Sequence, residues 1–132
     1  MNGNEITALL DEWNSALQTG DPKKVSVLYE TNGILLPTLA DKVCHNHEEI
    51  EDYFVHFLAK GPTGKIDEAN VRTFGLLAIN SGVYTFTFKD GSAMQARFTF
   101  VYRWNGGRWM IVEHHSSQMP EKNQGQGYTF DR

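Results

Sequence analysis

The spacing of apolar residues changes once along this chain, from a helical period to a strand period, near residue 60. Before that point, apolar residues recur three and four positions apart, as on one face of a helix. After the segment Lys60-Gly61-Pro62-Thr63-Gly64, apolar and polar residues alternate, as in strands with one buried face. Helices followed by hairpins favour an α+β fold, with the helices packed on one face of a curved sheet.

Three helices are predicted in the first part. The first can end at Gly20, and its apolar stripe consists of Ile6, Leu9, Leu10, Trp13, Ala16 and Leu17. The second begins at Asp21-Pro22, an N-cap carboxylate followed by proline at the first helical position. We expect this short helix to stop near Asn32-Gly33 and to bury Val25, Leu28 and Tyr29.

The third helix is signalled by Asn46 with Glu49 three residues later, the spacing of a capping box. Its apolar stripe is Ile50, Tyr53, Phe54, Phe57 and Leu58. Between the second and third helices, residues 34–37 read as a short strand or edge segment, because Pro37 has no N–H to donate to a ladder.

The second part predicts antiparallel hairpins. Residues 83–88 and 97–104 alternate between aromatic and polar side chains, and the segment 89–92 forms the turn between them. A second turn at Asn105-Gly106-Gly107 leads to a last strand, residues 109–115. A weaker strand is expected over residues 70–79, ahead of a turn at Asn80-Ser81-Gly82.

Composition narrows the class of protein. With 132 residues, 40% hydrophobic and 21% charged, the chain predicts one folded domain over residues 1–132, with residues 118–132 as a loose tail. A net charge of −4 argues against binding to nucleic acid or to an anionic membrane, since either requires a basic face. We therefore expect the partner to be a small molecule or another protein.

The location is predicted from cysteine usage and from the first residues. A single cysteine, Cys44, permits no internal disulfide and fits a reducing compartment. The first residues lack a basic segment followed by an apolar run, and no apolar stretch reaches membrane-spanning length. We expect a soluble, cytoplasmic protein without a cofactor.

Several strings resemble the nuclear transport factor 2-like superfamily: Gly20-Asp21-Pro22 with Leu28-Tyr29, residues 34–37, Ile50 with Tyr53-Phe54, and above all residues 102–117. Within it, the chain is most similar to bacterial relatives of the association domain of calcium/calmodulin-dependent protein kinase II, including SnoaL-like and SgcJ/EcaC-type proteins. The resemblance spans roughly residues 5–120. It implies a cone-shaped curved antiparallel sheet, with three N-terminal helices enclosing a pocket, and dimerisation through the outer face of the sheet.

Alternation predicts which side chains face inward, except in the last strand. Both of its phases begin with apolar residues: Trp109 and Ile111 in one, Met110 and Val112 in the other. The resemblance decides between them, because a basic residue that lines the family's pocket corresponds to Ser116. It implies that His114 and Ser116 face inward. It also implies a homodimer through outward-facing Val101, Trp109 and Ile111.

The resemblance also exposes a departure from the family. The kinase association domain lines its pocket with arginines that bind carboxylates, whereas the corresponding positions here are Phe86, Phe100 and Ser116. We therefore expect an aromatic pocket that binds an uncharged or weakly polar small molecule. The predicted ligand-binding residues are Tyr29, Tyr53, Phe57, Tyr84, Phe86, Phe98, Phe100, Tyr102, Val112 and Ser116.

His114 is the candidate catalytic residue, because imidazole exchanges protons near neutral pH; the alternative is a hydrogen-bonded pocket histidine without chemistry. Tyrosines could donate to a substrate carbonyl or simply be core residues. The nearest carboxylates are Asp41, Asp52 and Glu113, none of them clearly inside. The pair His45 and His47 lacks further ligands at metal-binding spacing, so no metal is predicted.

Three functions follow. The first is a small-molecule-binding and oligomerisation domain like the kinase association domain, without kinase activity, since the glycine-rich loop and catalytic loop of kinases are absent from the sequence. The second is a small isomerase, cyclase or dehydratase that acts on a hydrophobic carbonyl compound with His114 as acid/base. The third is an adaptor that binds another protein, although the sequence contains no short motif that indicates this function.

Overall fold

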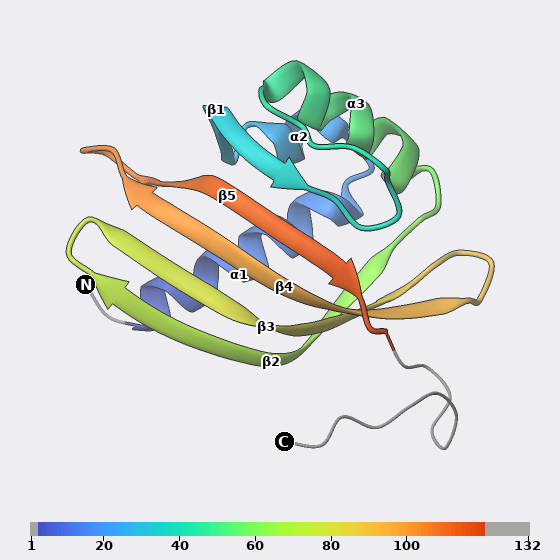
Figure 1. Cartoon of the computed structure of the whole chain (residues 1–132). Helices are drawn as coiled ribbons and strands as arrows, with labels where there is room; N and C mark the ends of the chain where they lie inside the picture. The colour runs from blue at the N-terminus through green and yellow to red at the C-terminus, as the bar shows by residue number, and fades with distance from the viewer. Residues whose placement is uncertain (1–2, 121–132) are drawn as a thin grey trace.

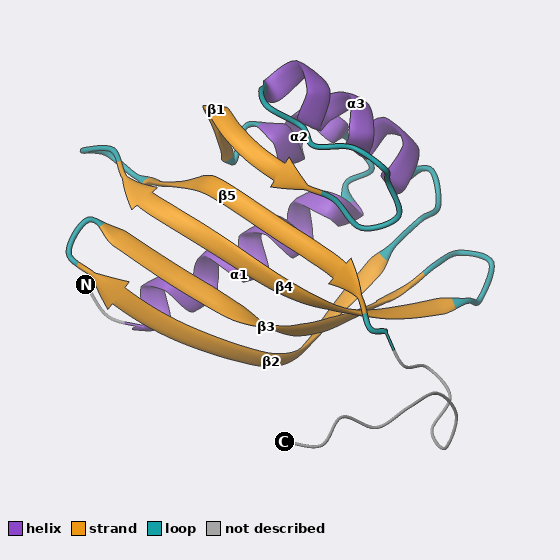
Figure 2. Cartoon of the chain, viewed as in Figure 1, coloured by secondary structure: helices purple, strands orange, loops and turns teal. Residues whose placement is uncertain are grey.

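The computed structural model describes residues 3–120 and has three helices and five strands in this range (Figure 1). In chain order they are α1 (Gly3–Gln18), α2 (Pro22–Ser26), β1 (Tyr29–Leu36), α3 (His47–Leu58), β2 (Thr63–Phe74), β3 (Leu77–Thr87), β4 (Ala93–Trp104) and β5 (Trp109–Gln118). Helices dominate the first half and strands the second (Figure 2). The predicted α+β class is confirmed.

The five strands form one curved sheet in the order β1-β5-β4-β3-β2. Strands β2 to β5 pair antiparallel with their neighbours, whereas β1 pairs with β5 in parallel. The sheet is therefore mixed, not wholly antiparallel as expected. A parallel pair needs a long connection, and α3 with three strands supplies it between β1 and β5.

The second helix is shorter than predicted. It begins as expected, with the N–H of Lys23 donating to Oδ1 of Asp21 at 3.0 Å, but it ends at Ser26. Tyr29 begins β1 and pairs with Ile111 of β5, and its side chain is fully buried. Strand pairing and burial at Tyr29 thus outweigh the helical spacing of the preceding apolar residues.

The third helix begins as its sequence predicts. The N–H of Glu49 donates to Oδ1 of the N-cap residue Asn46 at 2.9 Å. The carboxylate of Glu49 accepts from the N–H of His45 at 2.8 Å, one residue before the position of an ordinary capping box. These bonds fix where the loop of residues 37–46, which leads from β1 to α3, meets the helix.

The turn predicted at Asn80-Ser81-Gly82 is wrong, because these residues lie inside β3. The chain turns instead between β2 and β3, where Gly75 has a φ of +65°. A Cβ on Gly82 would lie 2.0 Å from the carbonyl oxygen of Glu68, where β2 carries a bulge. The glycine therefore serves the close approach of two strands, not a reversal of the chain.

One extra residue in β5 changes which face its side chains occupy. Val101 of β4 lies opposite Glu113, but the next residue, Tyr102, lies opposite Ile111, so Val112 is a bulge residue without a partner. Side chains on both sides of the bulge consequently face the same interior.

The prediction that Trp109 and Ile111 lie on the outer face is wrong for this reason. They are only 4% and 3% exposed, and beyond the bulge His114 is 2% exposed as well. Strand β5 also extends further than predicted, to Gln118, and the N–H of Met119 donates to the carbonyl of Gln95. Of the predicted tail, residues 121–132 lie outside the described residues.

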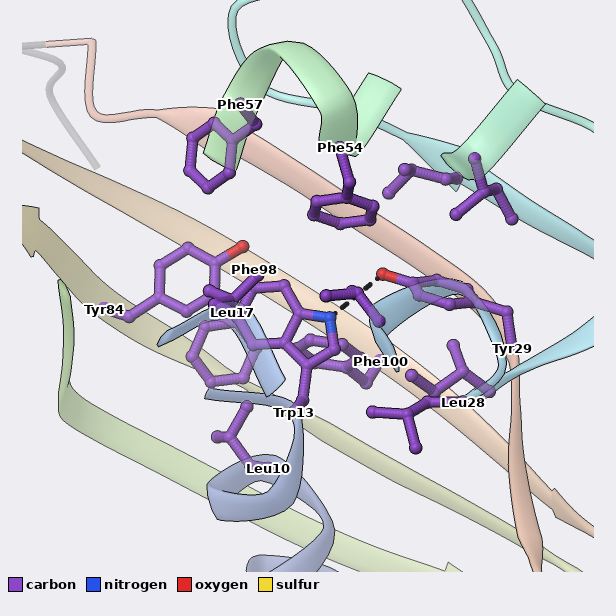
Figure 3. Packing of buried hydrophobic residues seen from close by; sticks show 14 of the residues in the cluster. Leu10, Trp13, Leu17, Leu28, Tyr29, Phe54, Phe57, Tyr84, Phe98 and Phe100 are labelled. Carbon is purple, nitrogen blue, oxygen red and sulfur yellow. Dashed lines mark hydrogen bonds between the residues drawn. The ribbon is translucent and has the colours of Figure 1, made fainter. Parts of the chain in front are cut away.

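The core lies between the concave face of the sheet and the helices, with Trp13 of α1 at its centre (Figure 3). The ring of Trp13 stacks on that of Tyr84 at 5.8 Å and meets Phe54, Phe86 and Phe100 edge to face. Aromatic rings from α1, α3 and the four strands β1, β3, β4 and β5 thus belong to one buried cluster.

Among the described helices, none combines the length and apolar character needed to cross a membrane.

Candidate functional site

A small, partly enclosed cavity of about 10 Å³ lies inside the aromatic cluster, large enough for about one water molecule. Helices α1 and α3, the end of β1, the loop after it and strands β3 and β5 supply its walls. The lining residues are Trp13, Leu35, Pro37, Thr38, Tyr53, Phe54, Phe57, Tyr84, Phe86, His114 and Ser116. No aspartate, glutamate, lysine or arginine is among them, so the cavity offers no counter-charge to an ionic ligand.

Buried polar groups form a continuous hydrogen-bonded chain along this cavity. The indole Nε1 of Trp13 donates to Oη of Tyr29 at 3.2 Å (Figure 3). Tyr29 Oη lies 2.8 Å from Nδ1 of His114, whose Nε2 lies 3.2 Å from Oη of Tyr84. The chain therefore joins α1, β1, β5 and β3 through four side chains.

The hydrogen-bonded network continues to the loop after β1. The hydroxyl of Tyr84 donates to Oγ of Ser116 at 2.6 Å, and the hydroxyl of Thr38 donates to the same oxygen. The hydroxyl of Tyr53, on α3, donates to the backbone carbonyl of Thr38 at 2.8 Å. Thr38 is thus bonded to β5 through its side chain and to α3 through its backbone.

Proton counting fixes the tautomer of His114. The oxygen of Tyr29 accepts from Trp13, so its own proton needs an acceptor, which Nδ1 of His114 provides. Nε2 then carries the ring proton and donates to Oη of Tyr84. The hydroxyl of Tyr84 in turn donates to Oγ of Ser116. Every donor from Trp13 to Tyr84 has an acceptor in this arrangement, and the opposite tautomer would leave the buried Tyr29 proton without one.

Burial keeps His114 neutral. Desolvation lowers the pKa of its imidazole from 6.5 to about 3, with a smaller contribution from the neighbouring His115. Desolvation likewise raises the pKa of Tyr84 and Tyr53, so both phenols keep their protons. The site at neutral pH is therefore a set of uncharged donors and acceptors.

The loop of residues 37–46 closes the cavity in a strained conformation. Leu39, next to Thr38, has a φ of +66°, and it is the sole described residue other than glycine with a positive φ. The left-handed conformation costs a branched side chain about 1–2 kcal/mol. Leu39 is 56% exposed, so little burial offsets this cost. The bonds of Thr38 hold the loop in place.

The predicted ligand-binding residues divide into two groups. Tyr53, Phe57, Tyr84, Phe86 and Ser116 line the cavity, and the candidate catalytic residue His114 lines it with them. The others lie elsewhere: Tyr29 lies behind the lining residues Trp13 and His114, to which it is hydrogen-bonded, Phe98 and Phe100 pack behind the wall, Val112 is the bulge residue, and Tyr102 lines a second cavity.

Sequence reasoning missed Thr38 and Trp13. In the folded protein these two residues lie at the two ends of the hydrogen-bonded network. Trp13 is part of the predicted apolar stripe, and nothing in that stripe marks its indole N–H as a donor to the site. Thr38 follows Pro37 in a loop without periodicity. The proline that ends β1 is the one signal that a pocket-facing segment starts there.

The second cavity, also of about 10 Å³, lies at the other end of the inner face. Its walls include Leu9, Leu28, Tyr102, Trp109 and Ile111, with Glu12 and Arg108 at its edge. Oη of Tyr102 and Nε1 of Trp109 are buried and have no hydrogen-bond partner among residues 3–120. The bulge at Val112 thus lets β5 contribute to two cavities.

The candidate carboxylates do not reach the first cavity. Asp41, Asp52 and Glu113 are exposed. Nδ1 of His45, in the loop before α3, lies 3.0 Å from Oε1 of Glu49, and Nε2 of His47, the first residue of α3, lies 2.6 Å from the carbonyl oxygen of Tyr29. Within the described range, no three residues of metal-ligating type gather in one place.

Comparison with known proteins agrees with this geometry. Residues 2–120 match the family described as calcium/calmodulin dependent protein kinase II association domain. The solved structure of a protein from Xanthomonas campestris, provisionally named as such a domain, is 48% identical, with a TM-score of 0.87 over 92% of this chain and 91% of that one. No curated protein matches this chain.

More distant structures share the fold alone. One is provisionally named a dehydratase of the NTF2-like family, from Streptomyces avermitilis, with 14% identity and a TM-score of 0.76 over 89% of this chain and 96% of that one. Another is provisionally named a ketosteroid isomerase, from Parabacteroides distasonis, with 19% identity and a TM-score of 0.73 over 87% and 86%. The fold is thus NTF2-like, and the chain belongs to the calcium/calmodulin-dependent protein kinase II association domain family.

Proposed function

We propose that this protein is a small-molecule-binding domain without kinase activity of its own, acting in the cytoplasm, and that its ligand is uncharged and largely aromatic. The observation that carries the proposal is the cavity itself: aromatic walls, no ionic side chain among its lining residues and a neutral His114. Removing a carboxylate from water without a partner costs several kcal/mol, so such walls favour neutral compounds.

The test compares two probes of similar size, acetophenone and benzoate, on the wild-type protein. Binding to the folded state raises the melting temperature, which differential scanning fluorimetry measures. We expect a concentration-dependent rise with acetophenone and none with benzoate. NMR shifts of the amides of His114 and Ser116, with exposed Thr99 as the reference, locate the binding. A larger rise with benzoate, or shifts confined to the outer face, would contradict the proposal.

An isomerase, cyclase or dehydratase activity with His114 as acid/base is the alternative. Both ring nitrogens of His114 are bonded to tyrosines, and its pKa is lowered to about 3. A general base is most effective when its pKa lies near the working pH. The geometry therefore supports binding better than proton transfer.

We also propose that two copies associate through the outer face of the sheet. With Trp109 and Ile111 buried, the support comes from Val101 of β4 and Ile79 of β3, which are paired across the strands and half-buried on that face. An apolar cross-strand pair facing water is a suitable centre for a self-complementary contact.

A further inference from the structure

The aromatic cavity lined by His114 and Ser116 has a hydroxyl proton without an acceptor. Oγ of Ser116 accepts from both Tyr84 and Thr38, so its own proton has no partner among the described residues. If Ser116 donates to Thr38 instead, the proton of Thr38 is the one left over. Ser116 and Thr38 are both more than nine-tenths buried and line the cavity, so the free donor lies where a ligand would be.

The cavity as it stands is too small for an organic ligand, so a wall residue must move to admit one. About 10 Å³ holds no organic molecule, and Thr38 is the lining residue that lies on a loop and is bonded directly to Ser116. Its neighbour Leu39 lines two outer depressions of about 500 and 280 Å³, which also share Lys60. Tyr53 and Phe57 line both the smaller depression and the aromatic cavity. Movement of Thr38 and Leu39 would therefore widen the cavity toward the surface.

We propose that the ligand carries a neutral oxygen acceptor, such as a ketone, aldehyde or amide carbonyl, that this oxygen accepts the free proton of Ser116, and that the Thr38 side chain moves away to make room for it. The proposal rests on the function proposed above and names the polar group of its ligand. Ser116 then donates to the carbonyl while its oxygen still accepts from Tyr84, and this chain of hydroxyls polarises the new bond. Release of Thr38 lets Leu39 leave its left-handed conformation, which favours the open loop.

The test compares two probes, acetophenone and ethylbenzene, of which only acetophenone has a carbonyl group. Isothermal titration calorimetry measures the affinity of the protein for each probe. We expect wild type to bind acetophenone about three- to tenfold more tightly than ethylbenzene, the usual worth of one neutral hydrogen bond. Ser116→Ala should abolish this preference. Ser117→Ala, which removes the same group from the neighbouring exposed residue, should preserve it.

The loop is tested separately. Thr38→Ala, which unties the loop and adds space, should tighten binding of both probes. Leu39→Gly, which removes the strain from the closed loop, should weaken both by about fivefold. Val43→Gly, at an exposed position of the same loop, controls for flexibility alone and should not weaken them.

The outcomes separate the two proposals. If wild type and Thr38→Ala bind neither probe, the pocket is not a binding site and both proposals fail. If wild type binds the probes equally, or if the preference for acetophenone survives in folded Ser116→Ala, the cavity binds apolar molecules and the assignment of Ser116 and Thr38 is wrong. Circular dichroism of each variant establishes that it is folded.

Discussion

The imidazole of His114 lies parallel to the ring of Phe100, with the ring centroids 3.9 Å apart and an angle of 13° between the planes. The two residues are direct partners across β4 and β5. Trp13 covers the edge of the same imidazole at 5.3 Å. Stacking and burial leave His114 only 2% exposed, and the two tyrosines bonded to its nitrogens hold its orientation.

This environment predicts a pH dependence of stability. The pKa of His114 is about 3 in the folded protein and about 6.5 for an ordinary histidine, so the unfolded chain binds the proton more readily. The contribution of neutral His114 to the free energy of unfolding is complete above pH 6.5. This contribution is lost as the pH falls from 6.5 toward 3, by about 1.4 kcal/mol per pH unit.

Urea unfolding of wild type and His114→Phe between pH 7.5 and 4.5 isolates this contribution from that of the carboxylates. We expect the free energy of unfolding of wild type to fall more steeply than that of the variant. His56→Gln, which changes an exposed histidine of α3, should follow wild type. Parallel curves for wild type and His114→Phe would show that His114 titrates normally.

Two of the buried tyrosines, Tyr29 and Tyr102, should respond differently to loss of the hydroxyl. Tyr29→Phe leaves Nε1 of Trp13 and Nδ1 of His114 each without a partner and should destabilise the fold by about 1–3 kcal/mol. Tyr102→Phe removes a hydroxyl that has no partner within residues 3–120, so its cost should stay below about 1 kcal/mol. Chemical denaturation measures both, and equal losses would contradict the assigned bonds.

Gly82 should tolerate no side chain. In Gly82→Ala the new Cβ would meet the carbonyl oxygen of Glu68, a backbone atom that cannot rotate away, so we expect a loss of about 2 kcal/mol or more. Gly107→Ala is the matched control, because its Cβ would meet no atom closer than 3.7 Å. Thermal melts of both variants test the expectation, and an unchanged melting temperature for Gly82→Ala would count against the bulge geometry.

Two charge insertions distinguish the core from the outer face. Trp109→Glu buries a carboxylate and should unfold the domain, whereas Val101→Glu should leave it folded and convert the proposed dimer to a monomer of 15.0 kDa. Light scattering after size exclusion measures the mass, and circular dichroism the fold. A wild-type mass near 15 kDa at micromolar concentration would exclude the dimer.

Periodicity predicted most of the fold because it reports burial. It located α1 and α3, the β3–β4 and β4–β5 hairpins and the inward aromatic residues of β4. It failed where one residue changes the phase. The four apolar residues from Trp109 to Val112 fit either phase of a regular strand, and a bulge makes parts of both face inward.

The site was predictable only in part because it is assembled from distant segments. The resemblance placed His114 and Ser116 inward, and the structure does so too. Thr38 reaches Ser116 only because β1 runs parallel to β5, a pairing that no local pattern encodes. The parallel partner of an edge strand depends on tertiary packing, which spacing alone does not report.

The same parallel pairing determines when the pocket can form. Tyr29 and His114 are 85 positions apart, and Thr38 and Ser116 are 78 apart. When a nascent chain has left the ribosome only as far as β4, it contains all the aromatic residues of the helices and of β3. It cannot yet form the Tyr29–His114 and Thr38–Ser116 hydrogen bonds, because β5 is missing. Contacts of such long sequence separation are slow to close, so the polar interior is a late event of folding, and aromatic surface stays open to solvent until β5 arrives.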